Sequence, residues 1–128
     1  KSSVLFLWTT SPMLQRSMTI MGVWGFEYKS QLVWDKKKTG TGYWARNRHE
    51  IVLIGNRGHG LCPRPAPFPD SIIEEKRTEH SRKPEALQNR IDIVWPHLRK
   101  IELFARRKRP GWHVWGNETD KFDAASQI

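Results

Sequence analysis

Two clusters of positive charge give the first chemical signal in this sequence. Residues 36–38 are three consecutive lysines, and residues 106–109 read Arg-Arg-Lys-Arg. Side chains of like charge packed this closely repel one another unless water or a bound anion meets them. Tyr43 and Trp44 follow the lysines closely, and aromatic rings stack on exposed bases. The pattern has two interpretations, a solvated basic face or a nucleic-acid surface, and the aromatic rings favour the second.

The sequence gives little support for a nucleotide-binding loop, a metal site or a nucleophilic serine. Glycines 55, 58 and 60 have the wrong spacing for a dinucleotide-binding loop, and no Lys-Ser/Thr pair follows them to make a P-loop. His59 and Cys62 lack the two further ligands that a zinc site needs, so we expect no metal. No Gly-x-Ser-x-Gly run marks a nucleophilic serine. The region 58–70 therefore reads as a Gly- and Pro-rich loop.

The elements that must position these residues follow from apolar patterning. The continuous apolar run 4–8 suits a strand buried on both faces, as in a parallel sheet. Ser11-Pro12 is typical of a helix start, and Leu14, Met18 and Met21 then fall on one helical stripe, which Gly22 and Gly25 close. Further strands are expected at 28–34, 51–55, 100–105 and 114–115, and a second helix after Pro84 with Leu87, Ile91 and Val94/Trp95 on one face.

Strands that alternate with helices predict an α/β layered sheet. Ligands of such sheets bind beyond the carboxyl ends of the strands, so function should lie in loops 9–11, 36–49, 56–83 and 106–113. The 128 residues carry 22 Lys and Arg against 13 Asp and Glu, a net charge of +9. No apolar run is long enough for a membrane span, and the single cysteine fits a reducing compartment, so we expect a cytoplasmic protein.

Three stretches carry a family resemblance: residues 41–55 (TGYWARNRHEIVLIG), 80–84 (HSRKP), and 100–106 (KIELFAR) continued by 109–118 (RPGWHVWGNE). In this order and spacing they resemble the adenine-N6 methyltransferase family that includes the catalytic subunit of the messenger-RNA m6A writer. The Ala-Arg-Arg-x-Arg-Pro-Gly-Trp wording is more similar to the bacterial and phage branch. The resemblance spans residues 3–118.

The resemblance implies an α/β, Rossmann-like fold that uses S-adenosylmethionine (SAM), with a partial methyltransferase domain at 1–118 and a tail at 119–128. Loops 36–49 would lie on the target side and strand 100–105 on the SAM side. The implied cofactor-binding residues are Lys83, Glu102, Phe104, Arg106, Asn117 and Glu118. Trp44, Glu50 and Ser81 match target-side positions, and we add Lys36, Lys37 and Lys38 as phosphate contacts whose neutralisation should flatten the salt dependence of binding.

One family motif does not occur in residues 1–128. The catalytic Asp-Pro-Pro-Trp run lies, in the family, on the strand before the one that matches residues 4–8. We therefore expect a chain cut upstream of Lys1, a sheet without its N-terminal strands, and no methyl transfer by residues 1–128 alone. The carboxylate of that motif accepts N–H bonds from the target amine and orients it toward the methyl group.

The sequence thus predicts methyl transfer from SAM to the N6 amine of adenine in nucleic acid by the intact parent. DNA is favoured over RNA by the branch resemblance, although no residue separates the two sugars. Three alternatives stay open: an enzyme that acts on RNA, a non-catalytic binding module that has kept the fold and the basic face, and a basic α/β domain that binds polyanions nonspecifically.

Overall fold

The computed structural model describes residues 2–59, 70–76, 83–103 and 108–116. They belong to two compact units, Lys1–Val94 and Trp95–Ile128. The first unit holds, in chain order, β1 (Ser3–Thr9), the 3-10 turn η1 (Ser11–Met13), α1 (Leu14–Val23), β2 (Glu27–Asp35), β3 (His49–Arg57), β4 (Ile72–Glu74) and α2 (Ala86–Val94). The second unit holds β5 (Lys100–Leu103) and β6 (Trp112–Trp115).

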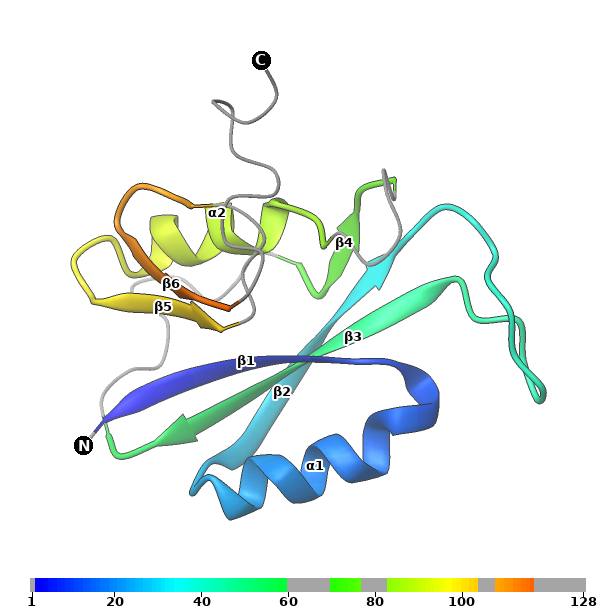
Figure 1. The fold of residues 1–128 in the computed structure, drawn as a ribbon, viewed down its shortest axis with the longest axis horizontal. Coiled ribbons are helices and arrows are strands. Elements are labelled where there is room, and N and C mark those ends of the chain that lie inside the picture. Colours follow the sequence, from blue (N-terminus) through cyan, green and yellow to red (C-terminus); the bar gives the residue numbers. More distant parts are fainter. Residues whose placement is uncertain (1, 60–69, 77–82, 104–107, 117–128) are drawn as a thin grey trace. The chain divides into compact units, whose positions relative to one another are not determined.

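The sheet of the first unit is mixed, which corrects the parallel arrangement inferred from the apolar run 4–8. Its strand order is β1-β3-β2-β4, and β3 runs antiparallel to both β1 and β2. No helix separates β2 from β3, and strands joined directly by a loop pair in opposite directions. β1 and β2, which α1 connects, run in the same direction on either side of β3 (Figure 1).

The predicted strands are all present where the structure describes them, and one further strand was missed. β4 covers three residues, Ile72–Glu74, inside the region 56–83 that the sequence indicated as a loop. It pairs in parallel with the end of β2, opposite residues 33–35. A strand of three residues is too short to show an apolar alternation, which explains why the pattern did not reveal it.

Helix α1 packs on one face of the sheet (Figure 1). Met21 forms a buried core with Ile51 and Leu53 of β3, and Leu14 packs against it, as predicted. Met18, by contrast, is 40% exposed. Ser17 takes the buried place instead, and its hydroxyl donates a 2.7 Å hydrogen bond to Thr9 Oγ1. Positions 14, 17 and 21 form a stripe as wide as the predicted one but rotated about the helix axis, so that Met18 lies at its margin. The helix ends before Gly25, whose φ of 86° suits glycine.

The two faces of the sheet divide the buried residues of β3 between them. Ile51 and Leu53 pack with Met21 beneath α1. Because side chains alternate along a strand, Glu50 and Val52 point to the opposite face, which Trp34 of β2 shares as the register partner of Glu50. This second face holds the candidate site described below.

Helix α2 begins two residues after Pro84 and buries Leu87 and Ile91, as the sequence predicted. Arg90 attaches it to the β4 segment by donating hydrogen bonds to the carbonyl oxygens of Asp70 and Ile72. The described helices are too short and too polar to span a bilayer.

In the second unit, β5 and β6 form a parallel pair with Glu102 opposite Val114. The predicted strand 100–105 is therefore present as far as Leu103, and residues 104–107 lie outside the described part. Gly111 precedes β6 with a φ of 82°.

The packing of Gly55 gives a test of this fold. A Cβ at Gly55 would lie 3.1 Å from both Met21 Sδ and Phe26 Cβ, so Gly55→Ala should lower the free energy of unfolding by about 1–3 kcal/mol through overpacking. Gly22→Ala is the matched control, because nothing lies within 4 Å of its Cβ, and it should raise stability by about 0.5–1 kcal/mol. Urea unfolding measures both, and equal effects of the two variants would contradict the packing described.

Candidate functional site

The candidate site is built around Glu50, a carboxylate on the central strand β3. It is only 9% exposed, and it lies directly opposite Trp34 on β2. Removing a carboxylate from water is costly unless opposite charges and hydrogen bonds compensate it. The question for this residue is therefore which groups provide that compensation.

Two lysines from different segments hold the Glu50 carboxylate. Lys83 Nζ donates a 2.6 Å hydrogen bond to Glu50 Oε1, and Lys36 Nζ lies 3.6 Å from Glu50 Oε2. The side chain of Lys36 is as buried as that of Glu50, at 12% exposure, and that of Lys83 is 31% exposed. Lys36 directly follows β2 and Lys83 directly precedes Pro84, so the pair of contacts joins two loops to the central strand.

Two tryptophans complete the cluster. Trp8 and Trp34 meet edge to face, with ring centroids 5.7 Å apart and planes inclined by 75°. Lys83 Nζ lies 5.3 Å from the centroid of the Trp8 ring, a cation–π contact that adds to its bond with Glu50. Trp34 is 1% exposed, and its indole N–H donates a 2.6 Å hydrogen bond to the Glu75 carbonyl oxygen.

This arrangement brings a hydrogen-bond acceptor, hydrogen-bond donors and aromatic rings together. An ionised carboxylate only accepts hydrogen bonds, an ammonium group donates up to three, and indoles supply flat apolar surface. Sequence reasoning had assigned Trp8 only to an apolar strand and had not singled out Trp34. Strand alternation could have placed Trp34 on the face of Glu50, but only with the register between β2 and β3, which no sequence pattern specifies.

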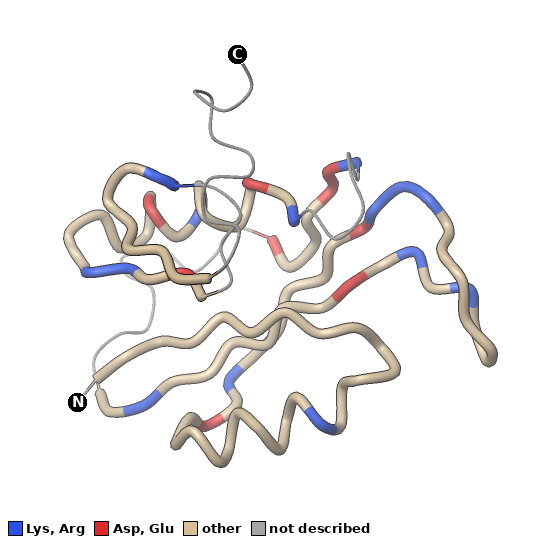
Figure 2. Tube along the Cα trace, in the orientation of Figure 1, with Lys and Arg blue, Asp and Glu red and all other residues tan. Residues whose placement is uncertain are grey.

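The three consecutive lysines have three different environments. Lys36 contacts Glu50, whereas Lys37 Nζ contacts Glu74 Oε1 and lies 3.5 Å from Asp35 Oδ2. Lys38 is exposed and forms no ion pair with any described residue. Figure 2 shows the lysines as one basic stretch where the chain leaves β2. Their side chains nevertheless diverge, because Lys37 adopts a φ of 61° and turns the chain.

Asp35 organises this turn. Its carboxylate accepts the Lys37 backbone N–H at 2.9 Å and Arg48 Nε at 3.2 Å. The bond from the Lys37 backbone and the one from Arg48 lower the pKa of Asp35 below its ordinary value of 3.8. The hydrogen bond to Glu74 raises the pKa of Lys37 above 10.5. We call these four residues, Asp35, Lys37, Arg48 and Glu74, the neck.

The structure brings only part of the predicted site together. Glu50, Lys83 and Lys36 meet, whereas Trp44 is fully exposed on the connection between β2 and β3. Glu102 is half-buried on β5 in the second unit. The remaining predicted residues lie outside the described part of the chain: Ser81, Phe104, Arg106, Asn117 and Glu118.

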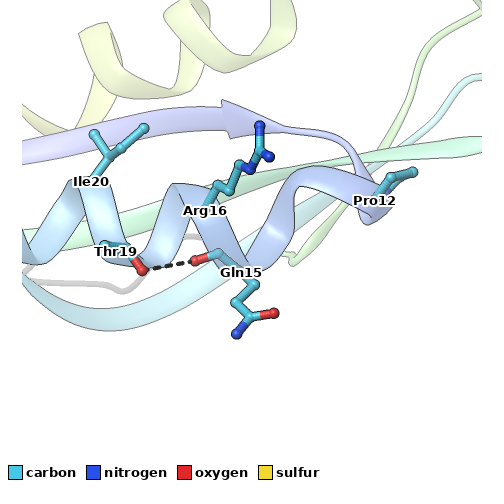
Figure 3. Close-up of a pocket in the computed structure, with 5 residues that line it drawn as sticks. All are labelled: Pro12, Gln15, Arg16, Thr19 and Ile20. Atoms are coloured by element: carbon cyan, nitrogen blue, oxygen red, sulfur yellow. Dashed lines mark hydrogen bonds between the residues drawn. The ribbon is translucent and has the colours of Figure 1, made fainter.

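An open groove on α1 does not belong to this cluster. Figure 3 shows its lining residues, Pro12, Gln15, Arg16, Thr19 and Ile20, with the Thr19 hydroxyl donating to the Gln15 carbonyl oxygen at 3.2 Å. The helix packs on the face opposite Glu50. Within the described ranges, no three His, Cys, Asp or Glu side chains gather to hold a metal ion.

Comparison with known proteins identifies the family to which this chain is similar. The family model for MT-A70 matches residues 1–118. The type II methyltransferase M.MunI of Mycoplasma sp is 40% identical over 116 residues, which are 90% of this chain and 50% of that protein. The human N(6)-adenosine-methyltransferase catalytic subunit METTL3 is 32% identical over 126 residues, 91% of this chain and 22% of that protein. The chain thus spans half of one relative's length and about a fifth of the other's.

The Glu50 cluster gives a stability test. Glu50→Gln removes the charge that compensates two largely buried ammonium groups, so the free energy of unfolding should fall by about 3 kcal/mol. Lys36→Met should cost less, because Lys83 still holds Glu50 at 2.6 Å. Glu27→Gln is the control, since its ion pair with Lys29 is exposed and should contribute little. Denaturant unfolding of the three variants measures the free energies of unfolding. A Glu50→Gln protein as stable as the Glu27→Gln protein would show that the ion pairs of Glu50 do not stabilise the fold.

The neck gives a pH test. A carboxyl whose pKa is lower in the folded state stabilises the fold above its ordinary pKa, and the stabilisation disappears as pH falls through the folded value. Asp35→Asn should therefore lower the thermal midpoint at pH 7, and the difference from the unsubstituted chain should vanish well below pH 3.8. Thermal unfolding across this pH range measures the difference in midpoint. A difference that is independent of pH would show that the charged Asp35 carboxylate does not stabilise the neck.

Proposed function

The chain belongs to the MT-A70 family, and on that premise we propose that it is the target-binding and cofactor-binding portion of an adenine-N6 methyltransferase that uses SAM and acts on DNA. The names of its relatives, a type II methyltransferase and an N(6)-adenosine-methyltransferase, support methyl transfer to adenine. The resemblance of residues 105–112 to the bacterial and phage branch supports DNA. The activity belongs to the whole parent protein.

The observation that carries this proposal is the Glu50 carboxylate, held by Lys36 and Lys83 beside two indoles. An adenine offers an exocyclic amine with two N–H donors on a flat ring. A charge-assisted hydrogen bond from that amine to Glu50 would orient the base, and the Trp8 ring, which is partly exposed whereas Trp34 is buried, would support it. The two ammonium groups compensate Glu50 in its buried place, so the carboxylate is positioned before a target enters.

The described residues also fit SAM by the chemistry of their donors and acceptors. The Lys83 ammonium uses one N–H on Glu50 and has others for a ligand carboxylate. Glu102 stays a proposed contact of the ribose diol through the family resemblance. When bound, SAM supplies an electrophilic methyl group on a sulfonium. Phe104, Arg106, Asn117 and Glu118 remain proposed cofactor contacts on the family resemblance alone.

An RNA target is the second candidate. It is favoured by the name of METTL3, an N(6)-adenosine-methyltransferase, and a base held at the Glu50 cluster would leave its sugar, which tells RNA from DNA, unread. A non-catalytic binding module differs from both, because it would bind nucleic acid without any effect of SAM.

A methylation assay separates these functions. The full-length parent is incubated with methyl-labelled SAM and either DNA or RNA of matched sequence, and N6-methyladenine is measured by mass spectrometry. We expect product on DNA, and Glu50→Gln should lower kcat/KM about 10- to 100-fold, with SAM affinity measured by calorimetry alongside. Lys83→Met should weaken SAM binding as well, and Glu27→Gln is the matched carboxylate control.

Each outcome of the assay favours a different one of these functions. Product on RNA alone would replace the proposed substrate with the second candidate. Nucleic-acid binding without product and without measurable SAM affinity would support the binding module and overturn the enzyme. Methylation that is unaffected by Glu50→Gln would show that the Glu50 cluster is not the place where the target adenine is held.

A further inference from the structure

The connection between β2 and β3 forms a defined arm. Residues 36–48 project beyond the ends of the two strands (Figure 1). Backbone hydrogen bonds tie its two sides together, from Lys36 N–H to the Arg48 carbonyl oxygen at 2.9 Å and from Gly40 N–H to the Asn47 carbonyl oxygen at 2.8 Å. The neck closes its base. The arm therefore has a shape that its own bonds maintain.

Glycines fix the path of the arm near its tip. A Cβ at Gly42 would collide with the Ala45 carbonyl oxygen, and a Cβ at Gly40 would lie 2.8 Å from the Asn47 carbonyl oxygen. Side chains at these positions would force the backbone apart. The close approach of the two sides holds Tyr43 and Trp44, which lie between them, at the tip of the arm.

Two aromatic rings stand at this tip in full contact with water. Tyr43 and Trp44 are 106% and 103% exposed, more than any other large apolar side chain of the described residues. Exposing aromatic surface is unfavourable, and large exposed rings on a maintained shape mark sites where a partner covers them. The Glu50 cluster does not use either ring.

The charge of the arm identifies the partner. Residues 36–48 contain five basic residues and no acidic one. Lys36, Lys37 and Arg48 meet carboxylates of the sheet, which leaves Lys38 and Arg46, both exposed, on either side of the rings. A second copy of the chain would bring another basic arm against this one, and the like charges would repel.

From these observations we propose that the arm is a base-stacking element: Tyr43 and Trp44 stack on unpaired bases of a nucleic-acid strand while Lys38 and Arg46 contact its phosphates. Stacking on aromatic rings combined with nearby cations is how single strands are held without sequence preference. The site is separate from the Glu50 cluster. The inference rests on the proposed function only in taking a nucleic acid as the partner.

Binding measurements on the full chain test the arm without any need for methylation. The probes are a fluorescent, mixed-sequence single-stranded DNA, the same sequence as a blunt duplex, and inorganic polyphosphate as a competitor that has charge but no bases. Fluorescence anisotropy is recorded over a range of NaCl concentrations. The variants are Tyr43→Ala/Trp44→Ala, Lys38→Gln and Lys37→Gln, and Trp24→Ala is the matched control, an exposed tryptophan outside the arm.

Each variant has its own expected signature. The double ring variant should bind the single strand at least tenfold more weakly, with an unchanged salt slope, an unchanged affinity for polyphosphate and an unchanged thermal midpoint. Its preference for the single strand over the duplex should disappear. Lys38→Gln should reduce the salt slope by about 0.7 on the single strand, whereas Lys37→Gln should not, because Asp35 and Glu74 already compensate Lys37.

Three results would overturn the inference. The first is a ring variant that binds the single strand as the unsubstituted chain does. The second is an equal loss for DNA and polyphosphate, which would make the arm a charge contact only. The third is self-association, seen by sedimentation, that the ring variant abolishes without any change in DNA affinity. Loss of the methylation function leaves the ring-dependent preference for the single strand intact, so the two proposals can fail separately.

Discussion

The compensation of one buried carboxylate links three segments of the first unit. Glu50 lies on the central strand of the sheet, where water cannot solvate it, and only ammonium groups brought from elsewhere offset that cost. Lys36 comes from the start of the arm and Lys83 from the segment before α2. The charge requirement of a single side chain thus brings both segments onto one face of β3, the face that also carries Trp34.

The sequence predicted the elements better than it predicted their directions. The apolar runs of β1 and β3 and the buried stripe of α2 are long enough to reveal themselves in the pattern. The antiparallel pairing of β3 was missed because the arm, which contains no helix, was taken as a loop of a parallel sheet. The absence of a helix between the two predicted strands was the signal for antiparallel pairing, because parallel neighbours need a crossover connection.

The candidate site shows a similar division between what sequence reveals and what it does not. Family resemblance pointed to Glu50 and Lys83, and the structure places them in contact. Asp35 was missed because its role is to accept bonds from the turn that follows it, and such a role depends on the φ of Lys37. The contact of Trp8 with Trp34 depends on the alignment of three strands, each of which the sequence shows separately.

The neck also changes how the positive charge of the arm should be counted. A run of lysines reads as a set of equivalent phosphate contacts, but the left-handed turn at Lys37 sends neighbouring side chains to Glu50, to Glu74 and to water. A cation that already meets a carboxylate releases few counterions when nucleic acid arrives. The arm should therefore contribute a smaller salt dependence than its five basic residues imply, and its affinity should rest to a greater extent on the rings at its tip.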